Sequence, residues 1–308
     1  MGDFTGKHIE IDAELVRHLI DTQFPQWSAL PVRAVEFSGW DNRTFHLGET
    51  MTVRLPSADG YKPQAEKEQY WLPRLAPHLP LPVPTLLAKG QPDTYFPGKW
   101  GVYRWIDGDV AKLDQLENVH DFGRSIAHFL RILQGIDATD GPLAGSHSFF
   151  RGASLLVYDG ETRRAIKVLQ DKIDADLATA IWQEALSSTW QNLPVWFHGD
   201  VASGNLIIKN GRLSAVIDFG CCGVGDPACD LVIAWTMLLG SSRSAFRAEL
   251  QVDDSTWARG RGWALWKALI TLEEHENTGN KAKTDEAWKT LSELVDEYRA
   301  LNEHKKCW

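Results

Sequence analysis

The chain of 308 residues is 44% hydrophobic and 24% charged, which is the ordinary composition of a globular protein with one large domain or two lobes. Its formal net charge of −9 argues against a nucleic-acid partner, which requires a basic surface. The first residues lack the basic and apolar regions of a secretory leader, and no apolar run is long enough to cross a bilayer, so we expect a cytoplasmic protein without a membrane partner.

The first third of the chain predicts a small region rich in strands. Its apolar runs are short, and glycine, asparagine and proline residues separate them. The expected elements are a helix over residues 10–24, a strand near 32–37, a hairpin of Thr44–Leu47 and Met51–Leu55 joined at Gly48-Glu49, a helix over 63–76, an extended proline-rich stretch over 79–90 and a strand over Trp100–Ile106.

After Asp107-Gly108 the sequence becomes mostly helical in pattern, because apolar residues recur at intervals of three and four. The expected elements are a long helix over Leu113–Leu133, a long loop over 134–153, helical segments within 161–191, a hairpin of Leu206–Ile208 and Leu213–Ile217, and mostly helix over 228–304. The chain therefore predicts an α+β protein.

The second hairpin carries polar side chains at both of its ends. An Asn210-Gly211 turn between two apolar runs is the strongest short hairpin signal. Asn205 precedes the first strand and Asp218 follows the second, so antiparallel pairing is expected to bring them to the same end of the hairpin. Asp200 lies on the loop that leads into it. We therefore expect two carboxylates and one amide oxygen to converge.

Such a group offers hard oxygen ligands, which suit Mg²⁺ bound through one or two carboxylates and substrate phosphates. A carboxylate that does not bind the metal can orient a hydroxyl group and accept its proton. The alternative is that these acids are turn and cap residues, which is the favoured interpretation for Asp226 before Pro227. The joint pattern of Asp200, Asn205 and Asp218 around one hairpin favours a site.

The segments "HGDVASGN", "VIDFG" and "GDPACDL" resemble the aminoglycoside/macrolide phosphotransferase family, which is related to the choline kinases. The resemblance runs from about Val32 to about Trp266. It implies an α+β, protein-kinase-like fold of two lobes: a small β-rich N-terminal lobe that binds the nucleotide, residues 1–106, and a larger, mostly helical C-terminal lobe for catalysis and substrate binding, residues 107–308.

The resemblance also implies roles for the residues of these motifs. Asp200 corresponds to the catalytic base, and Asn205 and Asp218 correspond to the magnesium ligands of the family. His198 and Asp230 correspond to structural residues that support the catalytic loop. The implied cofactor is Mg²⁺, with ATP or GTP as the phosphate donor.

In the first lobe, the family pattern implies residues that bind the nucleotide phosphates. Gly39 and Asn42 lie in the segment "SGWDNRTF", which is expected to cover the phosphates. Arg54 stands where the family usually has lysine, and it can fork to phosphate oxygens. Of the two acids on the following helix that could pair with it, the family pattern favours Glu68 over Glu66.

The segment "VYRWIDG" resembles the hinge between the lobes of kinase-like proteins. There the backbone of Arg104 and Ile106 is expected to meet the adenine edge, with Tyr103 behind it. Because backbone recognition leaves little trace in side chains, the sequence does not distinguish ATP from GTP.

The acceptor side of the site has opposing signals. Glu273, Glu274 and Glu276 offer carboxylates for a cationic acceptor, although a solvated helix end explains them equally well. Arg259 and Arg261 could meet an anionic acceptor, or only water.

The sequence thus predicts a kinase that transfers the γ-phosphate of ATP or GTP to a hydroxyl of an aminoglycoside- or macrolide-like small molecule. The loop at 140–153 is expected to border the acceptor, as long loops often do. A kinase of a metabolic sugar or amino alcohol, and a kinase-like module that binds nucleotide without catalysis, are the alternatives.

Overall fold

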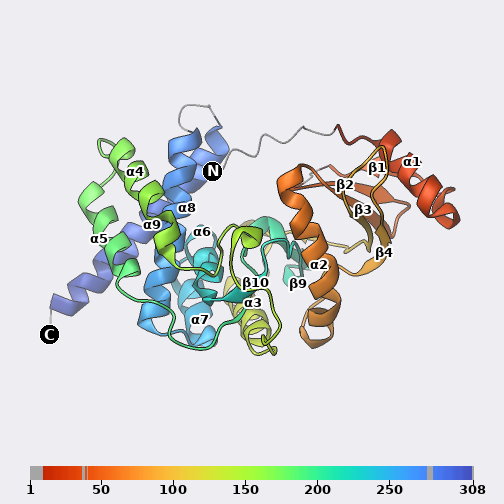
Figure 1. Ribbon diagram of the computed structural model, residues 1–308. Coiled ribbons are helices and arrows are strands. Elements are labelled where there is room, and N and C mark those ends of the chain that lie inside the picture. The colour runs from red at the N-terminus through yellow and green to blue at the C-terminus, as the bar shows by residue number, and fades with distance from the viewer. Residues whose placement is uncertain (1–9, 37–38, 40, 276–279, 307–308) are drawn as a thin grey trace. The chain divides into compact units, whose positions relative to one another are not determined.

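The computed structural model describes residues 10–36, 39, 41–275 and 280–306, which fall into two compact units (Figure 1). The first unit comprises the described residues of Met1–Gly108 together with Ala215–Gly220, and the second comprises Asp109–Ser214 and the described residues of Cys221–Trp308. Within these residues, no helix combines the length and apolar character needed to cross a membrane. A small antiparallel sheet in the first unit and a largely helical second unit confirm the α+β prediction.

A five-stranded antiparallel sheet with two helices forms the first unit (Figure 1). Its strands lie in the order β1-β2-β3-β5-β4. The elements are α1 (Ala13–Gln23), β1 (Val32–Ala34), β2 (Asn42–Leu47), β3 (Met51–Pro56), α2 (Lys62–Leu75), β4 (Leu86–Gly90) and β5 (Trp100–Arg104). The predicted first hairpin is confirmed as β2 and β3, whose turn is opened by Gly48 at φ +64°.

The two faces of this sheet carry different chemistry because side chains alternate along a strand. Val53 and Leu55 point to the face that α1 covers, and they share a buried core with Leu19 and Ile20 of that helix. Arg54, between them in sequence, points to the other face and reaches α2. Because Val53 and Leu55 pack into the hydrophobic core on one face, Arg54 lies on the opposite face of the sheet.

One expectation about the end of this unit is refined and one needs correction. The stretch 79–90 was expected to be extended, and within it Leu86–Gly90 pairs with β5 as an edge strand. The last strand ends at Arg104, not at Ile106, because Arg104 lies opposite Met51, the first residue of β3, and the ladder stops there.

Helices dominate the second unit, with short strands beside them (Figure 1). The helices are α3 (Val119–Gln134), α4 (Asp159–Leu169), α5 (Ala175–Leu186), α6 (Ile233–Thr236), α7 (Gly240–Leu250), α8 (Asp254–His275) and α9 (Lys281–Lys306). The strands are β6 (Asp109–Val110), β7 (Val195–Phe197), β8 (Leu206–Lys209), β9 (Arg212–Val216) and β10 (Gly223–Gly225). The predicted second hairpin is confirmed as β8 and β9, with Asn210 and Gly211 both at positive φ in its turn.

The predicted helix over Leu113–Leu133 is wrong at its beginning. Leu113–Gln115 forms a single 3₁₀ turn, and α3 begins at Val119. Asn118 sets this start, because its side chain accepts hydrogen bonds from the backbone N–H groups of His120 and Asp121. A cap of this kind satisfies donors that the first helical turn leaves without partners.

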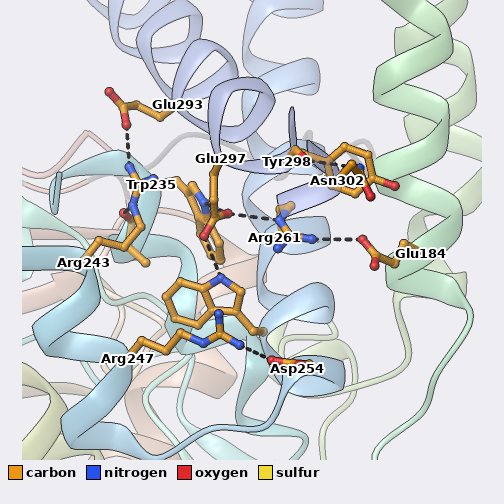
Figure 2. A network of polar contacts seen from close by, with 12 residues as sticks. Glu184, Trp235, Arg243, Arg247, Asp254, Arg261, Glu293, Glu297, Tyr298 and Asn302 are labelled. Carbon is orange, nitrogen blue, oxygen red and sulfur yellow. Dashed lines mark hydrogen bonds and ion pairs between the residues drawn. The ribbon is translucent and has the colours of Figure 1, made fainter. Parts of the chain in front are cut away.

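A buried polar network fixes α8 against its neighbours (Figure 2). The carboxylate of Glu297 on α9 accepts hydrogen bonds from the indole N–H groups of Trp235 and Trp257, and from Arg261 on α8. Arg261 also donates to Glu184 on α5, at 3.1 Å. Because the guanidinium side chain is almost fully buried, its two carboxylate partners hold three helices in register.

Replacing Asn118 by alanine removes the cap of α3. We expect the free energy of unfolding to fall by about 0.5–2 kcal/mol, as for other N-cap deletions. Urea denaturation monitored by circular dichroism measures this change. Arg124→Ala, an exposed substitution within the same helix, is the control and is expected to change stability by less than about 0.5 kcal/mol. Equal stability of the two variants would contradict the role assigned to Asn118.

Candidate active site

The loop that carries Asp200 starts directly after a buried strand. β7 pairs with β10, and the chain leaves β7 through His198 and Gly199. Gly199 has φ +86°, and a Cβ atom there would lie 2.6 Å from the carbonyl oxygen of Cys221. Only glycine fits this turn without strain, so Gly199 lets the loop bend sharply beside the strand pair.

A buried carboxylate holds the backbone of this loop. Asp230, which is fully buried, accepts hydrogen bonds from the backbone N–H groups of His198 at 2.8 Å and Gly199 at 2.7 Å. Burial raises the pKa of Asp230, and His198 and the two N–H groups oppose that rise. His198 is also fully buried, and its Nδ1 accepts the backbone N–H of Asp200 at 3.2 Å. Both residues therefore lie where they fix the loop.

Each carboxylate oxygen of Asp200 has its own partner. Asn205 Nδ2 donates to Oδ2 at 3.0 Å and to the backbone carbonyl of Asp200 at 2.9 Å. Lys267 Nζ lies 3.5 Å from Oδ1. Because the side chain of Asp200 is still 37% exposed, a substrate group can reach it.

The electrostatic surroundings of Asp200 keep it ionised. Burial would raise its pKa, but the positive charge of Lys267, followed by that of Arg151 and by His198, outweighs this effect, so the pKa lies below the usual value for aspartate. Asp200 is therefore a carboxylate able to accept a hydrogen bond at neutral pH.

Asp218 lies in the first unit, in a cradle of oxygen atoms. Its backbone is left-handed, at φ +64°, and two residues later Gly220 has no side chain. A Cβ atom on Gly220 would lie 3.2 Å from Asp218 Oδ1, 3.4 Å from Gln64 Oε1 and 3.5 Å from Asp41 Oδ2. These are hard ligands of the kind that Mg²⁺ prefers.

The donor set fits magnesium and not a metal held by protein alone. No group of three or more His, Cys, Asp or Glu side chains that could hold a metal ion occurs among the described residues. Mg²⁺ needs no such cage, since it keeps water ligands and is bound by one or two carboxylates plus phosphates. In the second unit, Asn205 turns its Nδ2 toward Asp200, so its amide oxygen faces away from that carboxylate.

Arg54 and Glu68 form a buried ion pair in the first unit. Arg54 Nη1 lies 2.8 Å from Glu68 Oε1, with the two side chains 15% and 4% exposed. Glu66, the alternative partner, instead pairs with Lys99 at the surface, at 3.3 Å. The guanidinium group of Arg54 also lies 5.3 Å from the ring centre of Tyr103. The structure thus pairs Arg54 with Glu68, the acid that the sequence favoured over Glu66.

The charges around Arg54 keep it protonated. Burial alone would lower its pKa, but the negative charges of Glu68, Asp218 and Asp41 raise it above the ordinary arginine value. Arg54 therefore lies in the electrostatic field of both Glu68 on α2 and Asp218 of the "VIDFG" segment.

The other residues expected to bind nucleotide are distributed along the sheet. Tyr103 is buried on β5, and burial raises the pKa of its phenol. The backbone N–H of Arg104 donates to Thr85 O at 2.9 Å, which leaves the backbone carbonyl of Arg104 as the group that could meet adenine. Gly39 accepts a hydrogen bond from Arg43 at 3.0 Å.

Asn42, within the segment expected to cover the phosphates, opens β2 opposite Pro56. Ser38 and Trp40 of that segment lie outside the described residues. Ile106 follows the end of β5 and is partly exposed.

The model of the phosphotransferase enzyme family matches residues 32–263. The chain belongs to this family. The match confirms the phosphotransferase family that the motifs predicted. None of the curated proteins compared with the chain matches it.

Solved structures of phosphotransferases share the fold of this enzyme. The GDP complex of aminoglycoside 2′-phosphotransferase-IIIa has a TM-score of 0.72 at 16% identity, covering 94% of this chain and 100% of the other. The GDP and kanamycin complex of APH(2″)-IIia has a TM-score of 0.70 at 18% identity, covering 92% of this chain and 98% of the other. Macrolide 2′-phosphotransferase MphH from Brachybacterium faecium has a TM-score of 0.58 at 19% identity, covering 91% of this chain and 97% of the other.

The acidic run near the end of α8 is partly neutralised in this phosphotransferase. Glu273 pairs with Arg164 on α4 through two hydrogen bonds, at 3.0 and 3.1 Å. Glu274 is half-exposed beside His275, and Glu276 lies outside the described residues. A carboxylate already held by arginine is a poor partner for a cationic acceptor.

The interpretation that Arg259 and Arg261 meet only water was wrong, because both are almost completely buried in ion pairs. The interpretation that they meet an anionic acceptor stays a prediction. Arg259 donates to Asp226 at 2.7 Å, while Arg261 donates to Glu184 and Glu297. These arginines stabilise the helical unit from within.

Two cations near Asp200 were missed by sequence reasoning. Lys267 follows Trp263 by four residues on α8, and Arg151 lies in the loop at 140–153, with its guanidinium group 4.7 Å from the ring centre of Trp266. A lysine on an otherwise apolar helical face was the available signal for Lys267. For Arg151, the only signal in the sequence was its position in a long loop.

Replacing Asp230 by alanine leaves the N–H groups of His198 and Gly199 without their acceptor. We expect a loss of about 1–3 kcal/mol in unfolding free energy for each buried N–H. We also expect faster hydrogen exchange at these two amides, measured by mass spectrometry. Asp176→Ala, at an exposed site on α5, is the control. Unchanged exchange at residues 198 and 199 would contradict the assigned role of Asp230.

Proposed function

We propose that this phosphotransferase transfers the γ-phosphoryl group of ATP or GTP to a hydroxyl group of a small molecule, with Asp200 as the base. The supporting observation is the environment of Asp200. It is an ionised, reachable carboxylate, held by Asn205 and Lys267 on a loop that Asp230 fixes. Solved structures of similar fold include complexes with GDP, ADP and ATP, which supports a nucleotide donor.

In the proposed reaction, the acceptor hydroxyl donates a hydrogen bond to Asp200. As the new bond from the hydroxyl oxygen to the γ-phosphorus forms, the hydroxyl proton passes to Asp200. The bond from the γ-phosphorus to the bridging oxygen breaks, and the nucleoside diphosphate leaves with that electron pair. The lowered pKa of Asp200 keeps it ready to accept the hydrogen bond.

The phosphates of the donor are proposed to lie against Arg54. Glu68 braces the guanidinium group, so that the other nitrogens of its fork can bind the α- and β-phosphates. Arg54 is bulkier than lysine and binds oxygens in a plane, so the phosphates would be held through two parallel hydrogen bonds. Gly39 and Asn42 are proposed to cover them.

Asn205 and Asp218 are the proposed ligands of Mg²⁺. The cradle of oxygens around Gly220 supports the assignment of Asp218. For Asn205, the support is that its Nδ2 is turned to Asp200, which leaves its amide oxygen for a metal. When bound, Mg²⁺ neutralises the charge that develops on the transferred phosphoryl group. The adenine or guanine edge is proposed to meet the backbone of Arg104 and Ile106, with Tyr103 behind it.

The acceptor is a small molecule with a hydroxyl group. An aminoglycoside- or macrolide-like molecule is one proposed acceptor, supported by the solved structures of similar fold, and a metabolic sugar or amino alcohol is the other. A cytoplasmic location stays a prediction. We do not favour a non-catalytic nucleotide-binding module, because such a module would not need an ionised, reachable carboxylate at Asp200.

Replacing Asp200 by asparagine tests the base. We expect the acceptor-dependent rate of nucleoside diphosphate release to fall by about 10²–10⁴-fold, because general-base catalysis is lost. The affinity for nucleotide, measured by calorimetry, should change by less than about threefold. Asp176→Asn is the matched control at an exposed aspartate. Retention of the rate in the Asp200 variant would exclude it as the base.

Replacing Arg54 by methionine tests the phosphate contact. We expect the dissociation constant for ATP or GTP to rise at least about tenfold, because a charge-assisted hydrogen bond is lost. Arg54→Lys should recover part of the affinity. Arg33→Met, an exposed arginine on β1 of the same sheet, is the control. If the methionine variant binds nucleotide as the wild type does, Arg54 has no role in phosphate binding.

A further inference from the structure

A small pocket lies beside Asp200, entirely within the second unit. Its lining includes Arg151, Asp200, Trp263, Trp266 and Lys267. The tryptophans form its wall, with their rings nearly perpendicular at 5.7 Å between centres. The guanidinium group of Arg151 lies over both rings, 5.4 Å from one and 4.7 Å from the other. An aromatic wall and two cations thus border the proposed base.

Two hydrogen-bond donors of residues that line this pocket have no partner among the described residues. Arg151 Nη1 and Trp263 Nε1 are both buried, and neither donates a hydrogen bond to a described residue. Trp263 is only 1% exposed, so its indole N–H is removed from solvent. A buried donor without an acceptor costs about 1–3 kcal/mol, and native proteins keep few of them. Two such donors lining one pocket point to an acceptor that binds there.

Other buried tryptophans of this unit show that the state of Trp263 is unusual. Each of four donates its indole N–H to a carboxylate at 2.7–2.9 Å: Trp182 to Asp159, Trp235 and Trp257 to Glu297, and Trp266 to Glu161. Trp196, also buried, donates its indole N–H to the backbone carbonyl of Asp137. The indole N–H of Trp263 has no such acceptor among the described residues.

The charge of the pocket favours an anion. Arg151 and Lys267 carry two positive charges, and Asp200 carries one negative charge. Of the nearby acids, Glu273 pairs with Arg164, and Glu161 accepts a hydrogen bond from the indole N–H of Trp266. Among the residues that line the pocket there is thus one positive charge in excess, which one carboxylate neutralises and a phosphate dianion exceeds. A polycation would meet two like charges there.

We propose that the acceptor is a hydroxy acid, whose carboxylate binds Lys267, Arg151 and Trp263 while its hydroxyl lies on Asp200. This assignment rests on the proposed function, because it takes Asp200 as the base. Lys267 Nζ is only 3.5 Å from Asp200 Oδ1, so the carboxylate and the reacting hydroxyl are separated by few bonds. Lys267 then has two tasks: it holds Asp200 ionised, and it selects the acceptor.

The test compares acceptors that differ only in charge. The probes are 4-hydroxybutyrate and glycerate, the amides of both acids, 4-amino-1-butanol, glycerol 3-phosphate and kanamycin. Calorimetry measures the binding of each probe to the wild-type protein, and nucleoside diphosphate release with Mg²⁺ and ATP or GTP measures turnover. We expect at least one hydroxy acid to bind at least about tenfold more tightly than its amide, because charge-assisted hydrogen bonds are formed.

Three variants locate this preference. Lys267→Met and Arg151→Met each remove a cation, and Trp263→Phe removes the N–H while keeping an aromatic ring. Each should lower the acid-to-amide ratio of affinities at least about threefold, while the affinity for the amide stays the same. A merely structural role would weaken acid and amide alike. Arg124→Met, which removes an exposed arginine from α3, is the control and should keep the ratio.

The outcomes separate this inference from the proposed function. Equal binding of acids and amides, absence of acid binding, or an unchanged ratio in all three variants overturns the inference. Phosphorylation of kanamycin without binding of the acids does so too, yet leaves the proposed function standing. A preference for glycerol 3-phosphate over glycerate overturns the carboxylate assignment in favour of phosphate. Acid binding that depends on Lys267, with no diphosphate release for any probe, supports the site and overturns the proposed function.

Discussion

The contact between Asp230 and the loop backbone is the constraint on which the rest of the site depends. A fully buried carboxylate that accepts the N–H groups of His198 and Gly199 fixes the bend after β7. Because Asp200 is the next residue, its position follows from that bend. The cost of burying Asp230 is met by hydrogen bonds that only this loop conformation supplies, so the carboxylate and the loop specify each other.

The second constraint is the position of α8. The carboxylate of Glu297 and the guanidinium group of Arg261 hold one side of this helix by buried, paired charges (Figure 2). Lys267 and Trp263, on the same helix, line the pocket beside Asp200. A helix held on one side can present unpaired donors on another, because their cost is offset elsewhere in the fold.

Prediction from the sequence succeeded where a signal is local. The Asn210-Gly211 turn specifies its hairpin because both residues accept positive φ. It failed at the start of α3, where apolar spacing extended the helix to Leu113 although Asn118 caps it later. It also failed for Arg259 and Arg261, since a charged residue predicts exposure until its buried partners are known.

By itself the sequence determined the family, the α+β class and the order of the motif residues around Asp200, because these depend on short spacings along the chain. Only the tertiary structure decided that Ala215–Gly220, with Asp218, belongs to the same compact unit as Arg54. It also decided which charges surround Asp200. Arg151 and Lys267 lie far from it in sequence, and packing, which no local pattern encodes, brings the three into one pocket.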